Sequence, residues 1–218
     1  MFSEIKYLIG KELLLEWRMK YAFSGILLYV AATVFVCYLS FKNIVDVPTW
    51  NALFWIIMLF ASVNAVAKSF LMESKGQLLY FYTLASPQSI LLSKTIYNVL
   101  LLLLLSLVCF GFYALFIGNK VQDIPLFAVT LVLGSIGFAS VLTLVSAIAS
   151  KTNNNFTLMA ILGFPILMPL LLTLIKVSKN AIDGLHMSVS WKYILVLALL
   201  DLIVILLAYL LFPYLWRD

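Results

Sequence analysis

Few residues of this chain have the chemistry of an active site, and those few stand apart from one another. Asp201 is an ionisable residue in the middle of an apolar stretch, and His186 is the one histidine. Intramembrane carboxylates mark proton or ion pathways in many proteins, and haem iron accepts His or Met ligands. For Asp201 we favour a structural hydrogen bond over a transport role, with Thr130, Ser135 and Thr173 as candidate partners at similar depth. His186 stands alone in a connecting segment, which favours an incidental residue over a metal ligand.

The common motifs of catalysis and nucleotide binding are missing from the sequence. It has no H-E-x-x-H zinc motif, no paired intramembrane carboxylates and no Ser/His arrangement for nucleophilic catalysis. It also lacks the G-x-x-x-x-G-K-S/T phosphate-binding loop, so hydrolysis of ATP by that route requires a partner. Cys37 and Cys109 fall inside apolar blocks and are interpreted as core residues. We therefore expect no enzyme activity and no cofactor or metal held by this chain.

A polar segment between two apolar blocks is the strongest candidate for contact with a soluble partner. It consists, in order, of Glu73, Ser74, Lys75, Gly76 and Gln77. Gly76 permits a backbone break and Ser86-Pro87 is typical of a helix start, so residues 68–94 predict a helix, a break and a second helix. Glu73 and Lys75 can form charge-assisted hydrogen bonds across an interface. We expect this hairpin to couple the membrane domain to a cytoplasmic partner; an inert re-entrant hairpin is the alternative.

Two prolines, Pro165 and Pro169, fall in the fifth apolar block. Each removes a helix hydrogen bond and crowds the preceding turn, which predicts a kinked or interrupted helix. A kink can open a pathway, but kinks also occur in membrane helices that do not move, and both interpretations stay open. Gly134 and Gly137 in the fourth block predict a close approach between helices.

These residues require a membrane bundle to hold them, because the chain is too apolar for a soluble globule. Of its 218 residues, 65% are hydrophobic and 11% are charged. The apolar residues form long blocks between charges, each sufficient to cross a hydrocarbon layer of about 30 Å as a helix. The sequence therefore predicts an all-α, polytopic membrane protein, a single transmembrane domain of residues 1–218. The six expected spans are about 21–41, 50–67, 95–118, 124–149, 156–175 and 193–214.

The charges outside the blocks predict the orientation of the bundle. The N-terminus, the second and fourth connections and the C-terminus hold nine of the 14 Lys and Arg residues, and the other three connections hold five. Because positive charge stays in the cytoplasm, both termini are expected there. Residues 1–20 are expected to form an interfacial amphipathic helix. Its apolar stripe consists of Phe2, Ile5, Leu8, Ile9, Leu13 and Trp17. The net charge of +5 flanks the membrane and favours lipid headgroups over nucleic acid.

Several of these features together resemble a known family. The coupling region of ABC-2-type export permeases has a spacing that is matched here by Glu73, Gly76, Leu84, Pro87 and Lys94. The fifth span is more specific, because residues 164–171, Phe-Pro-Ile-Leu-Met-Pro-Leu-Leu, are similar to the paired-proline segment of CcmB, the haem exporter B subunit of cytochrome c maturation. Residues 11–18 and 212–218 also resemble that family, so the resemblance covers nearly the whole chain.

The resemblance implies a homodimeric ABC-2-type permease subunit in the bacterial cell inner membrane. A separate CcmA-like ATPase would hydrolyse the ATP, and CcmC-like and CcmD-like membrane proteins and a CcmE-like haem chaperone would be further partners. The implied function is haem export, with haem as the substrate, or release of the haem-loaded chaperone. An ABC-2 permease for a lipid, polysaccharide or drug, and a membrane assembly scaffold without transport, are the alternatives.

Overall fold

The computed structural model describes residues 2–18, 20–41, 46–71, 85–151 and 156–217. Within these ranges every regular element is an α-helix. Six of the helices are long and apolar enough to cross a membrane: α2 (Lys20–Phe41), α3 (Val47–Val66), α6 (Pro87–Phe116), α7 (Ile124–Lys151), α8 (Phe156–Ile182) and α9 (Met187–Arg217). The all-α fold with six membrane-crossing helices predicted from the sequence is therefore confirmed.

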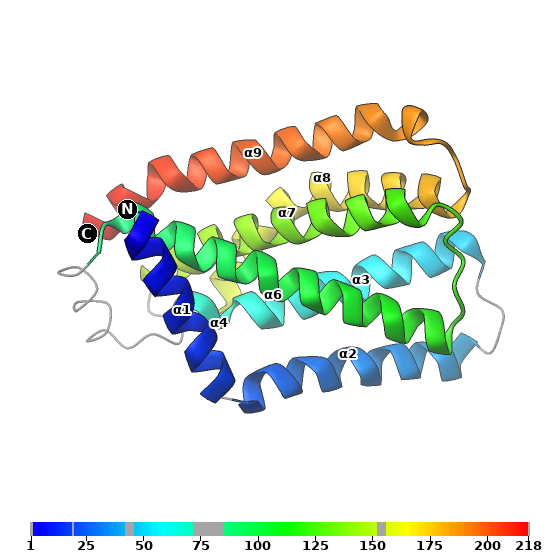
Figure 1. Ribbon diagram of the computed structural model, residues 1–218, viewed down its shortest axis with the longest axis horizontal. Coiled ribbons are helices and arrows are strands. Elements are labelled where there is room, and N and C mark those ends of the chain that lie inside the picture. The colour runs from blue at the N-terminus through cyan, green and yellow to red at the C-terminus, as the bar shows by residue number, and fades with distance from the viewer. Residues whose placement is uncertain (1, 19, 42–45, 72–84, 152–155, 218) are drawn as a thin grey trace.

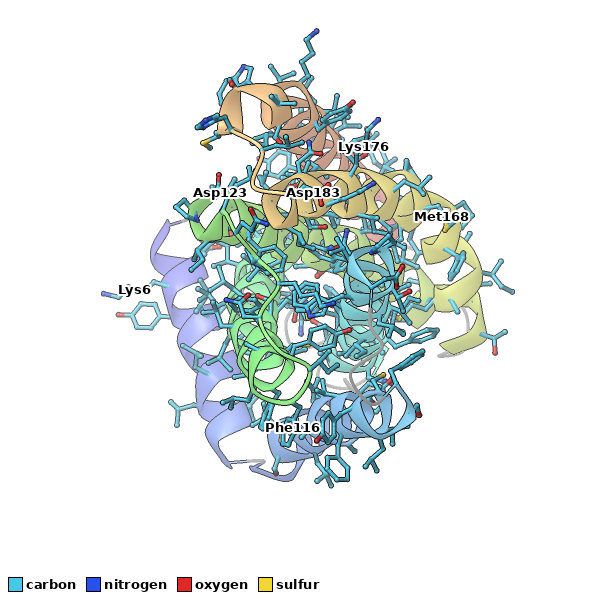
Figure 2. All side chains as sticks on the ribbon, turned by 90° about the vertical axis from the view of Figure 1, so that its right-hand side faces the viewer. Lys6, Phe116, Asp123, Met168, Lys176 and Asp183 are labelled. Carbon is cyan, nitrogen blue, oxygen red and sulfur yellow. The ribbon has the colours of Figure 1, made fainter. Side chains whose placement is uncertain are left out.

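The six long helices run side by side along the long axis of the molecule (Figure 1). A shorter helix, α1 (Phe2–Arg18), crosses them at one end, where α4 (Lys68–Leu71) and the start of α6 also lie. Both chain ends are found there, and we call it the terminal end. The connections 117–123 and 183–186 lie at the opposite end, called the far end below; its side chains face the viewer in Figure 2, where Asp123 and Asp183 are labelled.

Side-chain caps determine where two of the membrane-crossing helices begin. Asp46 caps α3 by accepting a hydrogen bond from the backbone N–H of Thr49 at 3.3 Å. Hydrogen bonding from Thr49 lowers the pKa of the Asp46 carboxyl. Ser86 caps α6 in the same way, accepting from the N–H of Ser89 at 3.4 Å, and Pro87 occupies the first turn. These caps satisfy helix N–H groups that have no partner within the helix.

The third membrane-crossing helix, α6, is longer than the expected span 95–118. It begins at Pro87, so the second helix of the expected hairpin continues unbroken into the membrane-crossing part. Lys94, which the sequence suggested as a boundary, lies inside α6 and is buried. Lys94 is accommodated inside the bundle because its ammonium group donates to Glu12 of α1 and to the Ser69 carbonyl of α4.

The core is arranged around α7, which packs against α3, α6, α8 and α9 and is largely buried. Near the far end, aromatic rings of three helices fill this core: Trp50 and Phe54 of α3, Tyr113 of α6 and Phe127 of α7. Trp50 Nε1 donates to the carbonyl of Gly118 at 3.0 Å, and the Tyr113 hydroxyl donates to the Trp50 carbonyl at 3.1 Å. Aromatic pairs of this kind add about 0.5–1.5 kcal/mol each beyond area burial.

Helix α1 lies across α6 with one face on the bundle and the other exposed. Ile5 is buried and Leu8 packs against the apolar cluster at the terminal end. Lys6 points away from the bundle (Figure 2), and Leu13 and Leu14 are exposed. Ile5 and Leu8 of the expected apolar stripe therefore face the protein, whereas Leu13 of the same stripe is on the outer face of α1. The position of α1 in the membrane interface stays a prediction.

Candidate functional site

The expected coupling residues Glu73, Ser74, Lys75, Gly76 and Gln77 lie outside the described residues. The structure does describe the two segments that lead into their connection. On one side α4 ends at Leu71, and on the other Ala85 and Ser86 precede α6. Both segments lie at the terminal end, close to α1 (Figure 1). Their contacts therefore define the candidate site.

Lys94 of α6 is the centre of a buried polar cluster that joins three helices. Its side chain is 4% exposed. Its Nζ donates to the carbonyl of Ser69 in α4 at 2.5 Å and to Glu12 Oε1 in α1 at 3.3 Å. It also lies 4.8 Å from the centre of the Phe70 ring. Charge-assisted hydrogen bonds and cation–π contacts are stronger away from water, so this Lys94 cluster (Glu12, Ser69, Phe70 and Lys94) fixes α1 and α4 to α6.

Asn98 extends the Lys94 cluster to α7. Its Nδ2 donates to Thr143 Oγ1 at 2.8 Å and to Ser69 Oγ at 3.2 Å. Lys94 and Asn98 are four residues apart, so they share one face of α6. Sequence reasoning missed both roles. A lysine and an asparagine at helical spacing in the membrane-crossing helix α6 were the signal that indicates such a site.

The first turn of α1 contacts Ser86, which follows residues 72–84. Glu4 Oε2 accepts hydrogen bonds from the Ser86 hydroxyl at 3.4 Å and from its backbone N–H at 3.5 Å. Hydrogen bonding from Ser89 and from Ser86 lowers the pKa of the Glu4 carboxyl. Because the folded chain favours the ionised form, this contact is stabilising above the usual Glu pKa. Its contribution is lost as the pH falls through the lowered value.

Asp201 lies on the buried face of α9, as its place in the sixth span predicted. It is 4% exposed and shares that face with Leu197, Val204 and Ala208. Neither carboxylate oxygen of Asp201 has a hydrogen-bond partner among the residues that the structure describes. The expectation of a structural hydrogen bond is therefore wrong within the described chain.

The three residues expected as partners of Asp201 bond to their own helices instead. The hydroxyl groups of Thr130, Ser135 and Thr173 each donate, at 2.8 Å, to the carbonyl group four residues earlier. This local bonding satisfies a hydroxyl inside a membrane helix without a second helix. Counting residues gives the depth of a side chain but not the direction in which its hydroxyl turns.

Gly137 of α7 provides the space that Asp201 occupies. A Cβ atom at position 137 would lie 2.5 Å from Asp201 Oδ1 and would also overlap Leu170 of α8. Gly134, one turn earlier, lies against the ring of Trp55, which a Cβ atom would approach to 2.9 Å. The close helix approach predicted at the two glycines is confirmed, and it brings α7, α8 and α9 together around Asp201.

The two prolines lie within α8, which runs as one helix from Phe156 to Ile182. Both are on the exposed face of α8. Met168, between them, points away from the bundle in Figure 2 and is 40% exposed. The helix is thus not interrupted at either proline, and the kink stays a prediction.

The described residues contain no group of three or more His, Cys, Asp and Glu side chains that could hold a metal ion. His186 is exposed in the connection between α8 and α9 at the far end. Cys37 and Cys109 are both free thiols. The polar groups of the Lys94 cluster hold helices together. At Asp201 the structure has a buried carboxyl group.

Comparison with known protein families identifies the family of this chain. The family model described as CcmB protein matches residues 3–214, a stretch that includes α1 and reaches into all six long helices. The chain belongs to the CcmB family. The resemblance seen in the sequence is confirmed, whereas a comparison with curated proteins found no match.

Membership of the CcmB family indicates the kind of complex to which the bundle belongs. A CcmB protein is a permease component of a haem-exporting ABC system that serves cytochrome c biogenesis, and that system includes an ATPase and other Ccm components. The six apolar helices agree with a multi-pass membrane protein. In this CcmB chain, the Lys94 cluster joins α1 and α6 to α4, the last described element before residues 72–84.

Proposed function

We propose that this CcmB chain couples ATP hydrolysis by a separate CcmA-like ATPase to haem export or to release of the haem-loaded chaperone. CcmC-like and CcmD-like membrane proteins, a CcmE-like chaperone and a second copy of the chain complete the proposed assembly. Membership of the CcmB family supports the ABC assignment. The lack of a phosphate-binding loop in the sequence supports a separate ATPase.

The observation that carries the proposal is that α6, which follows residues 73–77, is bonded both to α1 and to α4. Lys94 of α6 contacts Glu12 of α1 and Ser69 of α4, and Ser86 at the start of α6 contacts Glu4 of α1. A movement imposed on residues 73–77 would therefore reach α6 and, through Lys94 and Ser86, α1. Packed helices transmit such displacements because they repack between discrete arrangements rather than deform continuously.

Charge reversal at Glu73 combined with Gly76→Pro is expected to separate the ATPase from the permease. The change removes the negative charge that Glu73 would present to the ATPase, and it removes the backbone freedom of Gly76 at the expected break between the two helices. Recovery of the ATPase in a pull-down should fall about tenfold or more, equivalent to about 1.4 kcal/mol. The yield of c-type cytochromes should fall with it.

The matched control is Asp183→Lys, which reverses an exposed charge in a connection at the far end. It should retain both the ATPase and the cytochrome yield. If the Glu73→Lys, Gly76→Pro variant is well inserted and matches the wild type in both assays, residues 73–77 have no part in the mechanism.

We infer that the terminal end faces the cytoplasm of a bacterial inner membrane, from the nine Lys and Arg residues on that side. With Cys37 and Cys109 replaced by Ala, Lys75→Cys should be shielded from a membrane-impermeant thiol reagent in intact cells. Asp183→Cys should be labelled in the same cells. Both should react after permeabilisation. Labelling of Lys75→Cys with protection of Asp183→Cys would reverse the orientation.

We propose that Pro165 and Pro169 give α8 a bend that the working cycle uses. Because an interior proline costs about 3 kcal/mol in a helix, the double change to Ala should raise the thermal stability of the protein. It should lower the yield of c-type cytochromes at the same time. Pro213→Ala, a single interior proline of α9, is the matched control and should keep the yield. Full yield in the double variant would make the two prolines packing features.

A further inference from the structure

The carboxyl group of Asp201 is the one buried side-chain group whose polar atoms the described structure leaves without any hydrogen-bond partner. Native proteins have few such groups, and each one requires an explanation. Asp201 is not at a helix end, where water or headgroups reach. It lies 14 residues after the start of α9 at Met187 and 16 before its end at Arg217, close to the middle of the helix. Bulk water therefore does not solvate the Asp201 carboxyl group in the packed bundle.

The neighbours that the structure places against the Asp201 carboxyl group on α7 and α8 are Gly137 and Leu170, neither of which has a polar side chain. Gly137 of α7 leaves room for Oδ1, and Leu170 of α8 lies against the same point. On α9 itself, Leu197 and Val204 flank the carboxyl group on the buried face. The carboxyl group thus lies against the backbone of α7, in space that is open only because residue 137 is a glycine.

The described helices that pack against α9 place no countercharge at the depth of Asp201. Residues 124–150 of α7 and 156–175 of α8 contain no Lys, Arg, His, Asp or Glu. Helix α6 also packs against α9, and its residues 95–116 contain only tyrosines and a cysteine as titratable groups. On α9 the other titratable side chains between 193 and 214 are tyrosines.

The nearest cations lie toward the ends of the helices and have contacts of their own. Lys94 bonds to Ser69 and Glu12 at the terminal end. Lys176 lies 4.4 Å from the centre of the Tyr193 ring at the far end. Lys151 closes α7, 14 residues or about 21 Å along the helix from Gly137. An ionised Asp201 would thus be an unpaired charge in an apolar, membrane-embedded core, which a bound proton avoids.

We propose that Asp201 is a proton-binding site of the α7–α9 contact. While α9 packs on Gly137, the side chain is a neutral carboxylic acid. When the two helices part and water enters, the O–H bond breaks, the proton passes to water, and the carboxylate is hydrated. Closure reverses the step, with one proton taken from water for each carboxylate buried. The packing of α9 on α7 is thereby linked to proton uptake, whatever the protein transports.

The direct test is the infrared spectrum of the full-length protein in phospholipid nanodiscs at neutral pH. A protonated carboxyl group has a C=O stretching band distinct from that of carboxylates. We expect this band in the wild type, its loss in Asp201→Asn, and its retention in Asp183→Asn, which changes an exposed aspartate. The absence of the band in the wild type, or its persistence in Asp201→Asn, would overturn the proposal.

A second measurement uses the linkage between protonation and stability. If the folded chain holds a proton at Asp201 that the unfolded chain loses, stability falls as the pH rises. The melting temperature of the wild type should therefore drop by several degrees more than that of Asp201→Asn between about pH 5 and about pH 9. The amide of Asn is neutral and similar in size, so the variant is expected to fold. Equal pH dependence of the two proteins would contradict the proposal, and neither assay depends on haem or on an ATPase.

Discussion

Replacing Lys94 with Met is expected to release α1 from the bundle and to lower the free energy of unfolding by about 2–4 kcal/mol. Met retains most of the length of the side chain but removes the ammonium group. The Ser69 carbonyl loses a buried charged donor, Glu12 loses an ion-pair partner, and the cation over the Phe70 ring disappears. Thermal unfolding in detergent measures the loss of stability, and hydrogen exchange of the α1 amides measures the release of α1.

Lys192→Met is the matched control, because Lys192 is exposed on α9 at the far end. Its effect should stay within about 0.5 kcal/mol, and exchange in α1 should not change. Glu12→Gln should cost less than Lys94→Met, since Lys94 still donates to Ser69. Unchanged protection of α1 in Lys94→Met would show that the Lys94 cluster does not hold this helix.

Gly137→Leu is expected to have the largest effect of any single substitution in the midspan, about 3 kcal/mol or more of destabilisation. The first carbon of the new side chain already overlaps Leu170 and comes within 2.5 Å of Asp201 Oδ1. Relief of the overlap requires α8 or α9 to move away from α7. The melting temperature of the purified protein and the fraction that elutes as a monodisperse species measure the result.

Gly111→Leu provides the same chemical change on another membrane-crossing helix. Position 111 of α6 is exposed, and a Cβ atom there meets nothing within 4 Å. This variant should be as stable as the wild type. Gly137→Ala should lie between the two, because one carbon already overlaps. Equal melting temperatures of Gly137→Leu and Gly111→Leu would contradict the close packing of α7 described above.

The helices themselves were predictable because charge is costly inside a membrane. Blocks of apolar residues between charges predict six crossings, and the described chain has six helices that are long and apolar enough to make them. The same rule did not predict the burial of Lys94. Lys94 was interpreted as the edge of a span, and in the structure it lies buried inside α6, where its ammonium group donates to Ser69 and Glu12. A rule about single charges does not detect a partner 82 residues away in the chain.

The polar sites were only partly predictable. The burial of Asp201 follows from its depth, but its lack of a partner depends on where neighbouring hydroxyl groups turn. A second network was missed: Ser178 donates to Asn51 Oδ1 at 2.7 Å and accepts from Trp55 Nε1 at 2.8 Å. These residues of α3 and α8 are more than 120 positions apart, so no local pattern pairs them. Their contact is a product of the packing of the two helices.

The central claim is that this chain works as the permease of an ATP-driven complex, and purification from native membranes tests it most directly. Mild solubilisation of the affinity-tagged protein, followed by mass spectrometry, identifies what accompanies it. The account predicts recovery of an ABC ATPase together with CcmC-like and CcmE-like proteins. It also predicts that the ATPase alone is lost from the Glu73→Lys, Gly76→Pro variant. Recovery of the intact chain without any ATPase, from membranes that contain one of the CcmA type, would contradict the claim.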